Sequence, residues 1–299
     1  MSTETNTQDK TRIILVGKFQ RLWDEEYIAR SFESIGCEVF RLQEHQDYVD
    51  VNNHIKSRKP HILLYTKWDV HPETLRLCKL LGVKTVSWVF DLYFDYTREY
   101  QVKSKTFFKS EYVVTTDAGH DDRWKERGIN HKCVRQGIYA PECYMLKPEP
   151  DIDVVFVGSE SPVYPERNSM MINLSKHYNF RWFGRRDTNE VRGEKLNILF
   201  SRCKVVVGDS YYSPNYWSNR IVETLGRGGF LIHRDVPGLK EEYPDLVTYD
   251  GTLEDLMVKI DYYLANEKER LEIVKRNFEL VKSKYTMEHK CADLLNSIS

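Results

Sequence analysis

The sequence predicts an α/β protein made of two doubly wound domains, and three observations lead to this prediction. Short β-branched runs alternate with longer helix-like stretches, as in parallel sheets that helices cover on both faces. This alternation stops once, over residues 139–150 (YAPECYMLKPEP), which carry three prolines and no periodicity, and then it resumes. A length of 299 residues is also typical of two domains.

The first domain is expected over residues 11–140, after a polar lead-in of residues 1–10 that we expect to be disordered. Its apolar runs, rich in Val, Ile and Tyr, predict strands, and the stretches between them predict helices. The expected strands are residues 12–17, 38–42, 61–66, 85–90 and 112–115, and the expected helices are residues 23–34, 49–57, 72–81 and 121–127.

A linker is expected over residues 141–151, followed by a second domain over residues 152–283. The chain from residue 267 to residue 299 has a wholly helical pattern, with Leu271, Val274, Phe278 and Val281 spaced for one buried face. The expected strands of this domain are residues 153–158, 180–183, 204–208 and 230–233, and its expected helices are residues 167–177, 219–227 and 253–265.

The composition is that of a globular protein, with 41% hydrophobic and 30% charged residues. The net charge of −1 gives no electrostatic footprint for a dedicated nucleic-acid-binding protein. No apolar run is long enough to span a bilayer, and no secretory signal is visible. The six cysteines form no C-x-x-C pair and none lies near a His at metal-ligand spacing, so we expect reduced, mostly buried thiols in a cytoplasmic protein.

Two glycine-rich fingerprints are missing from the sequence. There is no G-x-G-x-x-G after a predicted strand, and there is no P-loop. Their absence disfavours a dehydrogenase and a kinase, although both classes use doubly wound sheets.

The segment of residues 211–230 (YYSPNYWSNRIVETLGRGGF) is the most informative part of the chain. It follows the expected strand 204–208, so it lies at a carboxyl end, where doubly wound sheets bind ligands. It opens with residue types that favour turns and helix N-caps, namely Pro214, Asn215, Ser218 and Asn219.

Two charged side chains follow in the expected helix. Arg220 lies in its first turn, where the helix amides and an arginine fork together suit a diphosphate. Glu223 lies one turn later, and its carboxylate can accept hydrogen bonds from ribose hydroxyls. The alternative is an ordinary loop–helix–strand unit in which Glu223 is a solvated surface charge.

In the first domain, several chemistry-bearing residues follow expected strands. Gly17 ends the first strand and allows a close approach of a ligand, although a plain turn explains it equally well. Asp117 and His120 follow the strand 112–115; His120 is a candidate general base or phosphate partner. A capping Asp117 and a surface His120 are the alternatives. Asp69, after the strand 61–66, is a further carboxylate on the acceptor side.

The order and spacing of a set of short motifs add a family resemblance. The chain resembles the GT-B glycosyltransferases, in particular the spore-maturation CgeB-like group with its glycosyltransferase-family-one-like C-terminal domain, over residues 85–299. The motifs are DVVFVGS at 153–159, ER at 166–167, FG at 183–184, SNRIVETLGRGGFL at 218–231, YD at 249–250, LEDL at 253–256, IDYYL at 260–264, ER at 269–270 and YT at 285–286.

The resemblance implies a GT-B fold of two facing Rossmann-like domains, in which residues 284–299 pack back on the first domain. The second domain would bind the nucleotide sugar, with Glu223 on the ribose, and the first would bind the acceptor. Catalysis would need no metal and no cofactor beyond the donor. Asp91 occupies a place where the group usually shows an Asp after an aromatic-rich strand, and the candidate catalytic residues are Asp91, His120 and Arg220. The candidate donor contacts are Gly158, Arg167, Arg185, Tyr212, Ser213, Asn215, Ser218, Asn219, Arg220 and Glu223, and the candidate acceptor-side residues are Gly17, Asp69, Asp91 and Asp117. A solvated surface position is the alternative for Arg185.

One departure from the related families concerns stereochemistry. Their retaining members often carry E-x7-E, and counting back from Glu223 places Asn215 at the first position. The sequence therefore leaves open whether the anomeric configuration is retained or inverted.

The expected function is the transfer of a sugar from a nucleotide diphosphate sugar, of which a UDP-sugar is the first choice, to an acceptor hydroxyl. The acceptor stays open between a polysaccharide precursor, a protein, a small molecule and a modified DNA base. Lys103, Lys105 and Lys109, with Phe107 and Phe108 between them, could border a DNA groove, or they form a solvated amphipathic helix. A non-catalytic nucleotide-sugar-binding module is the alternative from another class.

Overall fold

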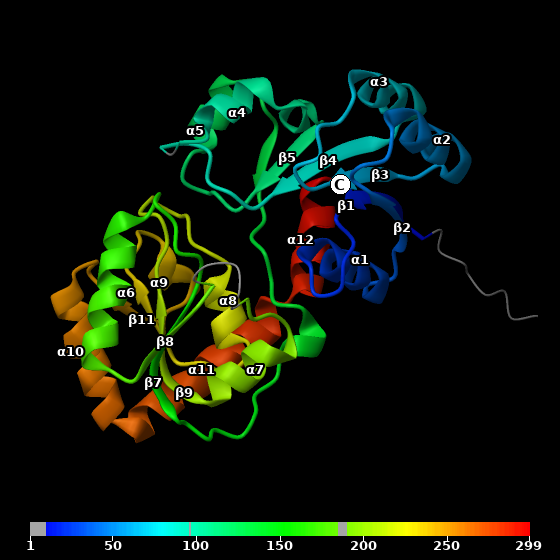
Figure 1. Ribbon diagram of the computed structural model, residues 1–299. Helices are drawn as coiled ribbons and strands as arrows, with labels where there is room; N and C mark the ends of the chain where they lie inside the picture. The colour runs from blue at the N-terminus through cyan, green and yellow to red at the C-terminus, as the bar shows by residue number, and fades with distance from the viewer. Residues whose placement is uncertain (1–9, 96, 185–189) are drawn as a thin grey trace, which may run out of the picture. The chain divides into compact units, whose positions relative to one another are not determined.

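The computed structural model describes residues 10–95, 97–184 and 190–299 (Figure 1). The chain divides into two compact units, of which the first comprises Met1–Arg135 with Met287–Ser299 and the second comprises Gln136–Thr286. Each unit is built around one parallel sheet with helices on both faces, which confirms the predicted α/β fold class.

The sheet of the first unit has the strand order β2-β1-β3-β4-β5-β6, and every pair of neighbours is parallel. Its strands are β1 (Arg12–Gly17), β2 (Glu38–Gln43), β3 (Ile62–Tyr65), β4 (Lys84–Val89), β5 (Tyr112–Thr115) and β6 (His131–Cys133). Its helices are α1 (Asp24–Ser34), α2 (Tyr48–Arg58), α3 (Pro72–Leu81), α4 (Glu99–Ser104), α5 (Asp121–Glu126) and α12 (Met287–Ser297), with a 3-10 turn η1 (Thr106–Lys109).

Both faces of this sheet are buried because successive side chains of a strand point to opposite sides. In β1, Ile13 and Leu15 pack against α1 and α12, whereas Ile14 and Val16 pack on the side of α2 and α3. Figure 1 shows α1 and α12 side by side, and Ser31 donates a hydrogen bond to Glu288 over 3.2 Å. The last helix of the chain therefore completes the first unit.

The sheet of the second unit has the order β11-β10-β9-β7-β8 and is also parallel throughout. Its strands are β7 (Ile152–Val157), β8 (Phe180–Phe183), β9 (Cys203–Gly208), β10 (Leu231–Arg234) and β11 (Val247–Tyr249). Its helices are α6 (Pro165–His177), α7 (Glu194–Ser201), α8 (Arg220–Leu225), α9 (Leu239–Glu242), α10 (Leu253–Ala265) and α11 (Glu267–Lys284), with a 3-10 turn η2 (Ala140–Glu142).

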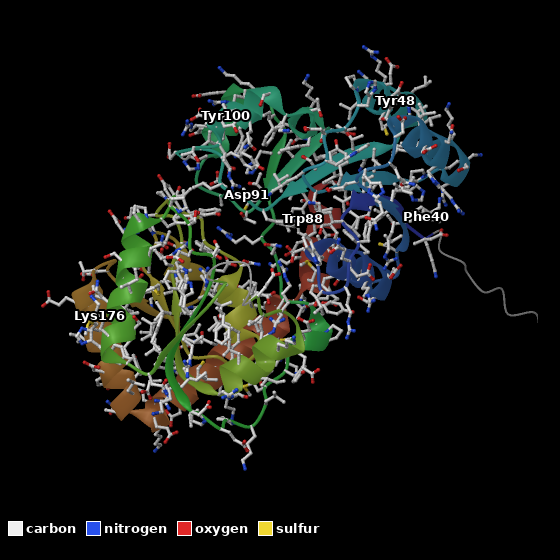
Figure 2. The ribbon with its side chains drawn as sticks, in the orientation of Figure 1. Phe40, Tyr48, Trp88, Asp91, Tyr100 and Lys176 are labelled. Atoms are coloured by element: carbon white, nitrogen blue, oxygen red, sulfur yellow. The ribbon has the colours of Figure 1, made fainter. Side chains whose placement is uncertain are left out.

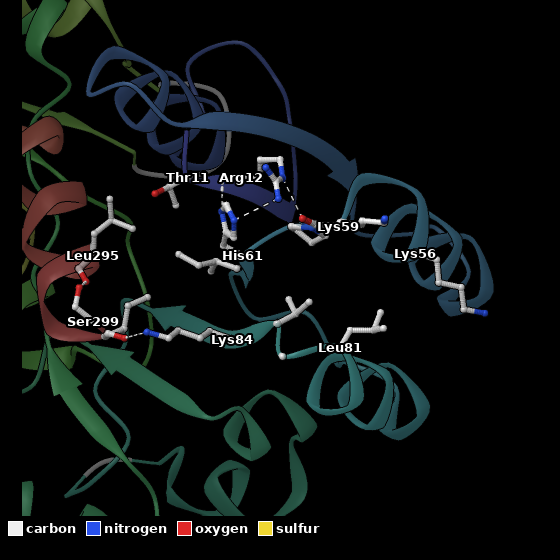
Figure 3. Close-up of a pocket in the computed structure, with 14 residues that line it drawn as sticks. Thr11, Arg12, Lys56, Lys59, His61, Leu81, Lys84, Leu295 and Ser299 are labelled. Atoms are coloured by element: carbon white, nitrogen blue, oxygen red, sulfur yellow. Dashed lines mark hydrogen bonds between the residues drawn. The ribbon is translucent and has the colours of Figure 1, made fainter. Parts of the chain in front are cut away.

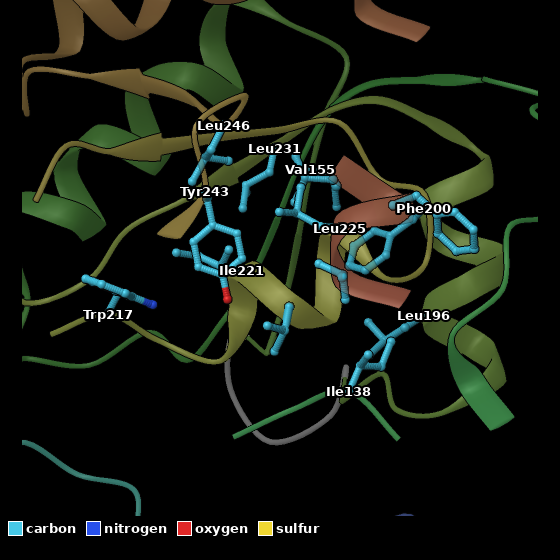
Figure 4. Close-up of a cluster of buried hydrophobic side chains, with 14 of the residues drawn as sticks. Ile138, Val155, Leu196, Phe200, Trp217, Ile221, Leu225, Leu231, Tyr243 and Leu246 are labelled. Carbon is cyan, nitrogen blue, oxygen red and sulfur yellow. The ribbon is translucent and has the colours of Figure 1, made fainter. Parts of the chain in front are cut away.

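Two apolar clusters cover the faces of the second sheet. On one face, Val155 and Leu231 pack with Phe200 of α7 and with Leu225 of α8 (Figure 4). On the other face, Val154 and its neighbours pack against α6 and α10. The short helix α8 is therefore anchored by its apolar side, which fixes where its polar residues lie.

The segment expected as a linker packs on the second unit instead. The carbonyl oxygens of Glu142 and Tyr144 both accept hydrogen bonds from the buried Asn197 side chain, at 3.0 and 2.8 Å. The backbone N–H of Glu149 donates to the carbonyl of Ser201 over 2.9 Å. Because these contacts are long-range in sequence, the proline-rich composition does not reveal them, and the boundary between units lies after Arg135.

The tail of the chain was expected to be helical over residues 267–299, with a separate C-terminal helix over residues 284–299, and the structure has two helices there, α11 and α12. Helix α11 stops at Lys284, and Thr286 forms an isolated parallel bridge with Ile138 before α12 begins. The predicted buried face was partly wrong, because Leu271 is 42% exposed. The buried positions of α11 are Arg270, Ile273, Asn277, Phe278 and Val281.

Side-chain burial follows this arrangement. Trp88 of β4 lies inside the first unit, where its indole N–H donates to the carbonyl of Val134 over 2.9 Å, whereas Tyr100 is exposed at the surface (Figure 2). None of the helices in the described ranges has the length and apolar character needed to cross a bilayer.

Candidate functional site

The strand order of each sheet reverses at one point, which is where doubly wound folds bind their ligands. In the first unit this switch point lies between β1 and β3, and in the second it lies between β7 and β9. At the carboxyl ends of the second pair, Gly158 follows β7 and Asp209 follows β9. A ligand of the second unit is therefore expected to bind near these two residues.

Arg220 bridges the two strand ends at this switch point. Its Nε donates to the carbonyl of Val157 over 2.9 Å, and its Nη1 donates to the carbonyl of Asp209 over 2.6 Å. The remaining Nη2 makes no hydrogen bond to the described residues, and it lies 2.8 Å from the place that a Cβ at Gly158 would take. A side chain at position 158 would therefore displace this guanidinium from its place.

Burial and repulsion from Arg167 lower the pKa of Arg220 to about 10. The guanidinium therefore stays protonated at neutral pH. It also lies over the ring of Phe156, with its Cζ 5.0 Å from the ring centroid. A fixed cation thus stands at the carboxyl edge of the sheet.

Two further arginines lie near the same edge. Arg167 of α6 donates to the carbonyl of Ser159 over 2.8 Å, and Arg234, which ends β10, lies over the ring of Tyr212 at 5.3 Å. Asp209 is buried, and burial raises its pKa against the opposing effect of the three arginines. In the described part of this edge, three cations face one buried carboxyl group, which favours an anionic ligand.

A chain of hydrogen bonds fixes the start of α8. The Nδ1 of His233 lies 2.7 Å from the carbonyl oxygen of Arg234, which can only accept, so this nitrogen donates. The Nε2 of His233 then accepts from the Ser210 hydroxyl at 3.0 Å, which in turn accepts from the Ser218 amide at 2.9 Å. Ser218 Oγ accepts from the Arg220 amide at 3.2 Å, whereas Asn219 makes no side-chain cap.

The buried ring of His233 makes folding stability depend on pH. Burial lowers the pKa of His233 to about 3, whereas an unfolded histidine titrates near about 6.5. The unfolded state therefore binds a proton first, and stability falls as the pH drops from about 6.5 toward about 3. We expect His233 to contribute a loss approaching about 1.4 kcal/mol per pH unit in this window.

Urea unfolding at pH 7.5, 6 and 5 measures this contribution. His233→Gln removes the titrating group, so its stability should fall less steeply with acid than that of the wild type, while other groups titrate equally in both proteins. Parallel curves for the two proteins would contradict the prediction.

Glu223 is held by a buried arginine. The side chain of Arg227 is 1% exposed; its Nη1 contacts the carboxylate of Glu223 and its Nη2 contacts that of Glu142. Its Nε donates to Asn197 Oδ1 over 3.1 Å. Glu223 itself is 26% exposed, so it is not the freely solvated charge of the alternative interpretation.

Asn215 has a backbone conformation that few side chains tolerate. Its φ is +54°, and its amide donates to the carbonyl of Pro237 over 2.9 Å. Its Oδ1 lies only 1.9 Å from where a Cβ at Gly238 would stand, so Gly238 makes room for it. Asparagine is among the residues that adopt this left-handed conformation most readily.

The remaining predicted donor residues lie in the same segment or outside the described residues. Tyr212 is 54% exposed, and Ser213 is buried with a hydroxyl that has no hydrogen-bond partner among the described residues. Arg185 lies outside the described residues. The structure thus gathers Gly158, Arg167, Ser218 and Arg220 at one edge, and their roles as donor contacts stay predictions.

In the first unit, two predicted carboxylates already have cationic partners. Asp91 (Figure 2) contacts Lys67 through one oxygen and Arg98 through the other, the latter at 2.5 Å. Asp69 accepts from Lys105 over 2.6 Å and from the amide of Thr106. Asp69 thus binds the backbone amide of the first residue of η1.

His120 lies between two carboxylates. Its Nδ1 is 2.9 Å from Asp117 Oδ2, and its Nε2 is 2.7 Å from Asp95 Oδ2. His120 and Asp117 are both buried, and Asp117 also accepts from the amide of Gly119. Because both ring nitrogens have partners, a base role for His120 would need one contact to open.

The structure does not support the alternative of a DNA groove along Lys103, Lys105 and Lys109. Phe107 and Phe108 are 3% and 4% exposed and pack against Tyr93 and Trp124 in the core, so they cannot stack on bases. Lys105 is paired with Asp69. The aromatic spacing of this segment therefore serves packing.

The sequence interpretation missed a carboxylate at the switch point of the first unit. Glu25 of α1 accepts a hydrogen bond from the Thr66 hydroxyl over 2.6 Å, directly after β3. In the second unit it missed Asp209, Arg234 and Arg227. Asp209 and Arg234 could have been found because each stands at the end of an expected strand; nothing in the local sequence marks Arg227 or Glu25.

A cavity of about 690 Å³ lies at the other edge of the first sheet (Figure 3). It is lined by Arg12, His61 and Lys84 at or beside the amino ends of three strands and by the end of α12. Lys84 Nζ donates to the carbonyl of Ile298 over 2.5 Å. This edge is opposite the one where doubly wound sheets bind ligands, so the cavity is not part of the candidate site.

Comparison with protein families gives a match that lies mostly in the second unit. A family model described as glycosyl transferase-like matches residues 142–296, just over half of the chain. No curated protein matches the sequence significantly.

Solved structures match over almost the whole chain. A glycosyltransferase from Rickettsia africae has a TM-score of 0.64 and 13% identity, covering 96% of this chain and 97% of its own. Sucrose-phosphate synthase from Thermosynechococcus elongatus has a TM-score of 0.65 and 12% identity, covering 96% and 98%. Anabaena HepE in complex with UDP-glucose has a TM-score of 0.62 and 11% identity, covering 96% and 99%. At these identities the match shows a common fold.

Proposed function

Because the chain belongs to the glycosyl transferase-like family, we propose that it moves a sugar from a nucleotide diphosphate sugar to an acceptor hydroxyl without a metal ion. The fold is GT-B, and the enzyme is a glycosyltransferase. The observation that carries the proposal is the cationic edge of the second unit, where Arg220 joins the ends of β7 and β9 at the switch point.

The donor site is proposed on this edge. The diphosphate would meet Arg220 Nη2 with Arg167 and Arg234 nearby, and the ribose would meet Glu223, whose carboxylate Arg227 holds in place. A UDP-sugar is the first candidate, and the Anabaena HepE complex with UDP-glucose supports this choice as a neighbour of the same fold.

These groups suit the chemistry of glycosyl transfer. As the bond between the anomeric carbon and the diphosphate breaks, negative charge grows on the leaving phosphate oxygens. The charge of Arg220 is fixed beforehand by its two backbone acceptors, so it needs little reorganisation during the reaction. This cationic edge would supply the stabilisation that a metal ion supplies in other transferases.

The acceptor is proposed to bind the first unit and to carry a free hydroxyl group. A polysaccharide precursor, a protein or a small molecule fits this description. A modified DNA base is disfavoured, because Phe107 and Phe108 are buried and cannot stack on bases. We also propose a cytoplasmic location, which the six free cysteines support.

Titration of the purified protein with UDP-, GDP- and TDP-sugars tests the donor. We expect saturable binding of one nucleotide class and slow donor hydrolysis in the absence of an acceptor. Binding without any hydrolysis or transfer in an acceptor screen with radiolabelled donors would favour a non-catalytic binding module, and no binding at all would exclude the proposal.

Glu223→Gln should act mainly on donor binding. A hydrogen bond from a neutral hydroxyl to a carboxylate contributes about 1.5–3 kcal/mol, so the donor KM should rise about tenfold or more. The kcat should change little, because the ribose contact is made equally in the ground state and the transition state. Initial rates over a range of donor concentrations measure both. Glu241→Gln on the exposed start of α9 is the matched control and should leave KM unchanged.

A further inference from the structure

The switch point of the first unit holds a carboxyl group. β1 ends at Gly17, and Thr66 directly follows β3 on the other side of the reversal. Glu25, in the first turn of α1, extends between them and accepts from the Thr66 hydroxyl over 2.6 Å. A Cβ at Gly17 would come within 2.5 Å of Glu25 Cγ, so the missing side chain of Gly17 makes room for this carboxyl arm.

Glu25 differs from the other carboxylates considered at this edge. Asp91 and Asp69 are bound to cations, and Asp117 is buried against His120. Among the residues that the structure describes, Glu25 forms no ion pair, and Thr66 is its side-chain hydrogen-bond donor. No salt bridge among the described residues would therefore have to break for a hydroxyl group to bind the Glu25 carboxylate.

The surroundings also adapt Glu25 to proton transfer. Burial raises its pKa, and the neighbouring charges of Asp24 on its own helix and Glu44 after β2 raise it further. The hydrogen bond from Thr66 opposes this effect, and Glu44 is partly neutralised by Lys18 at 3.3 Å. A carboxyl group with a raised pKa is a better acceptor for a proton near neutral pH than an ordinary surface glutamate.

We propose that Glu25 is the general base that takes the proton from the acceptor hydroxyl group. This inference rests on the proposed function and names the residue that completes it. The acceptor oxygen forms a bond to the anomeric carbon while its proton passes to the Glu25 carboxylate. The bond from that carbon to the diphosphate breaks, and its electron pair leaves with the nucleotide diphosphate. A single displacement of this kind inverts the anomeric configuration.

Thr66 is the positioning residue of this arrangement. Its hydroxyl donates to one carboxylate oxygen and thereby directs the other oxygen. Removal of the hydroxyl group leaves the base present but less well oriented, so the effect should be smaller than that of removing the carboxylate.

Glu25→Gln tests the proposal, because the amide keeps the shape and still accepts from Thr66. We expect turnover, measured as donor hydrolysis and as transfer to an acceptor found by screening, to fall about 100-fold or more. Donor affinity by titration should stay within about twofold, since the donor contacts are proposed in the second unit. Glu33→Gln on the same helix, whose carboxylate is 41% exposed and paired with Arg41, is the control and should retain full activity.

Two further readouts separate a base from a structural residue. Wild-type turnover should fall as the pH drops through the pKa of Glu25, since the base must be deprotonated. This fall at low pH, the acid limb of the pH–rate profile, should be absent in Glu25→Gln. Thr66→Val should keep the limb with turnover lowered about tenfold, the loss expected when a single hydrogen bond to a charged group is removed. NMR of the product should show the anomeric configuration opposite to that of the donor.

The outcomes distinguish this inference from the function on which it rests. An active wild type with Glu25→Gln within twofold of it, or a product of retained configuration, overturns the role of Glu25 and leaves the glycosyltransferase intact. A wild type that neither binds nor consumes any nucleotide sugar removes the proposed function and Glu25 with it. If Glu25→Gln melts early, Thr66→Val supplies the test, and an unchanged rate in that variant counts against the proposal.

Discussion

Replacement of Arg227 by methionine should lower the free energy of unfolding by about 3–5 kcal/mol, the cost of breaking a buried ion pair on one side. The side chain of Arg227 is 1% exposed and contacts the carboxylates of Glu142 and Glu223. Methionine fills similar volume but leaves both carboxylates without their cation and Asn197 Oδ1 without its donor. Urea unfolding of the two proteins at pH 7.5 measures the difference.

Arg276→Met is the matched control. Arg276 lies on α11 and pairs with Asp245 over 3.1 Å, but its side chain is 52% exposed. Exposed pairs contribute about 0–1 kcal/mol, so this variant should unfold close to the wild type. Similar losses for the two variants would mean that the buried cluster around Arg227 does not stabilise the second unit. Arg227→Met should also weaken donor binding, since Glu223 loses the group that orients it.

Much of the fold could be predicted because the strands are short apolar runs separated by amphipathic helices. The run 12–17 became β1 at the expected residues, and the run 180–183 became β8. The three-residue strands β6 and β11 were missed because so few residues carry no periodicity. The parallel bridge of Thr286 was not predicted because its partner, Ile138, lies far away in the sequence.

The candidate site was predictable only where position along a strand reveals it. Arg220 was found because it follows the loop after an expected strand, but its acceptors Val157 and Asp209 come from two different strands that only the fold brings together. Glu25 was missed because it lies inside a helix, and its partner Thr66 is 41 positions away. The ion pair of Arg227 with Glu142 spans 85 positions. Such contacts depend on sheet topology, which local patterns do not encode.

Arg220→Ala should have a large effect on catalysis. The guanidinium charge stands at the proposed diphosphate position, and loss of one such preorganised group costs about 100–1,000-fold in turnover. Both kcat and donor affinity should fall, because the phosphate charge is present in the ground state and grows in the transition state. This outcome differs in kind from that of Glu223→Gln, which should mainly raise KM. Steady-state kinetics of donor consumption measures both parameters.

The structure adds a second consequence for Arg220→Ala. The carbonyls of Val157 and Asp209 lose their donors, and the buried Asp209 loses a neighbouring cation, so the variant should also be less stable. Arg220→Lys separates the two effects, because lysine keeps the charge but cannot bridge two carbonyls with a planar fork. We expect its turnover to lie between those of the wild type and Arg220→Ala. Arg181→Ala, an exposed arginine of β8, is the control. If Arg220→Ala melts early yet consumes donor at the wild-type rate, Arg220 is a clamp between two strands and makes no contribution to the chemistry.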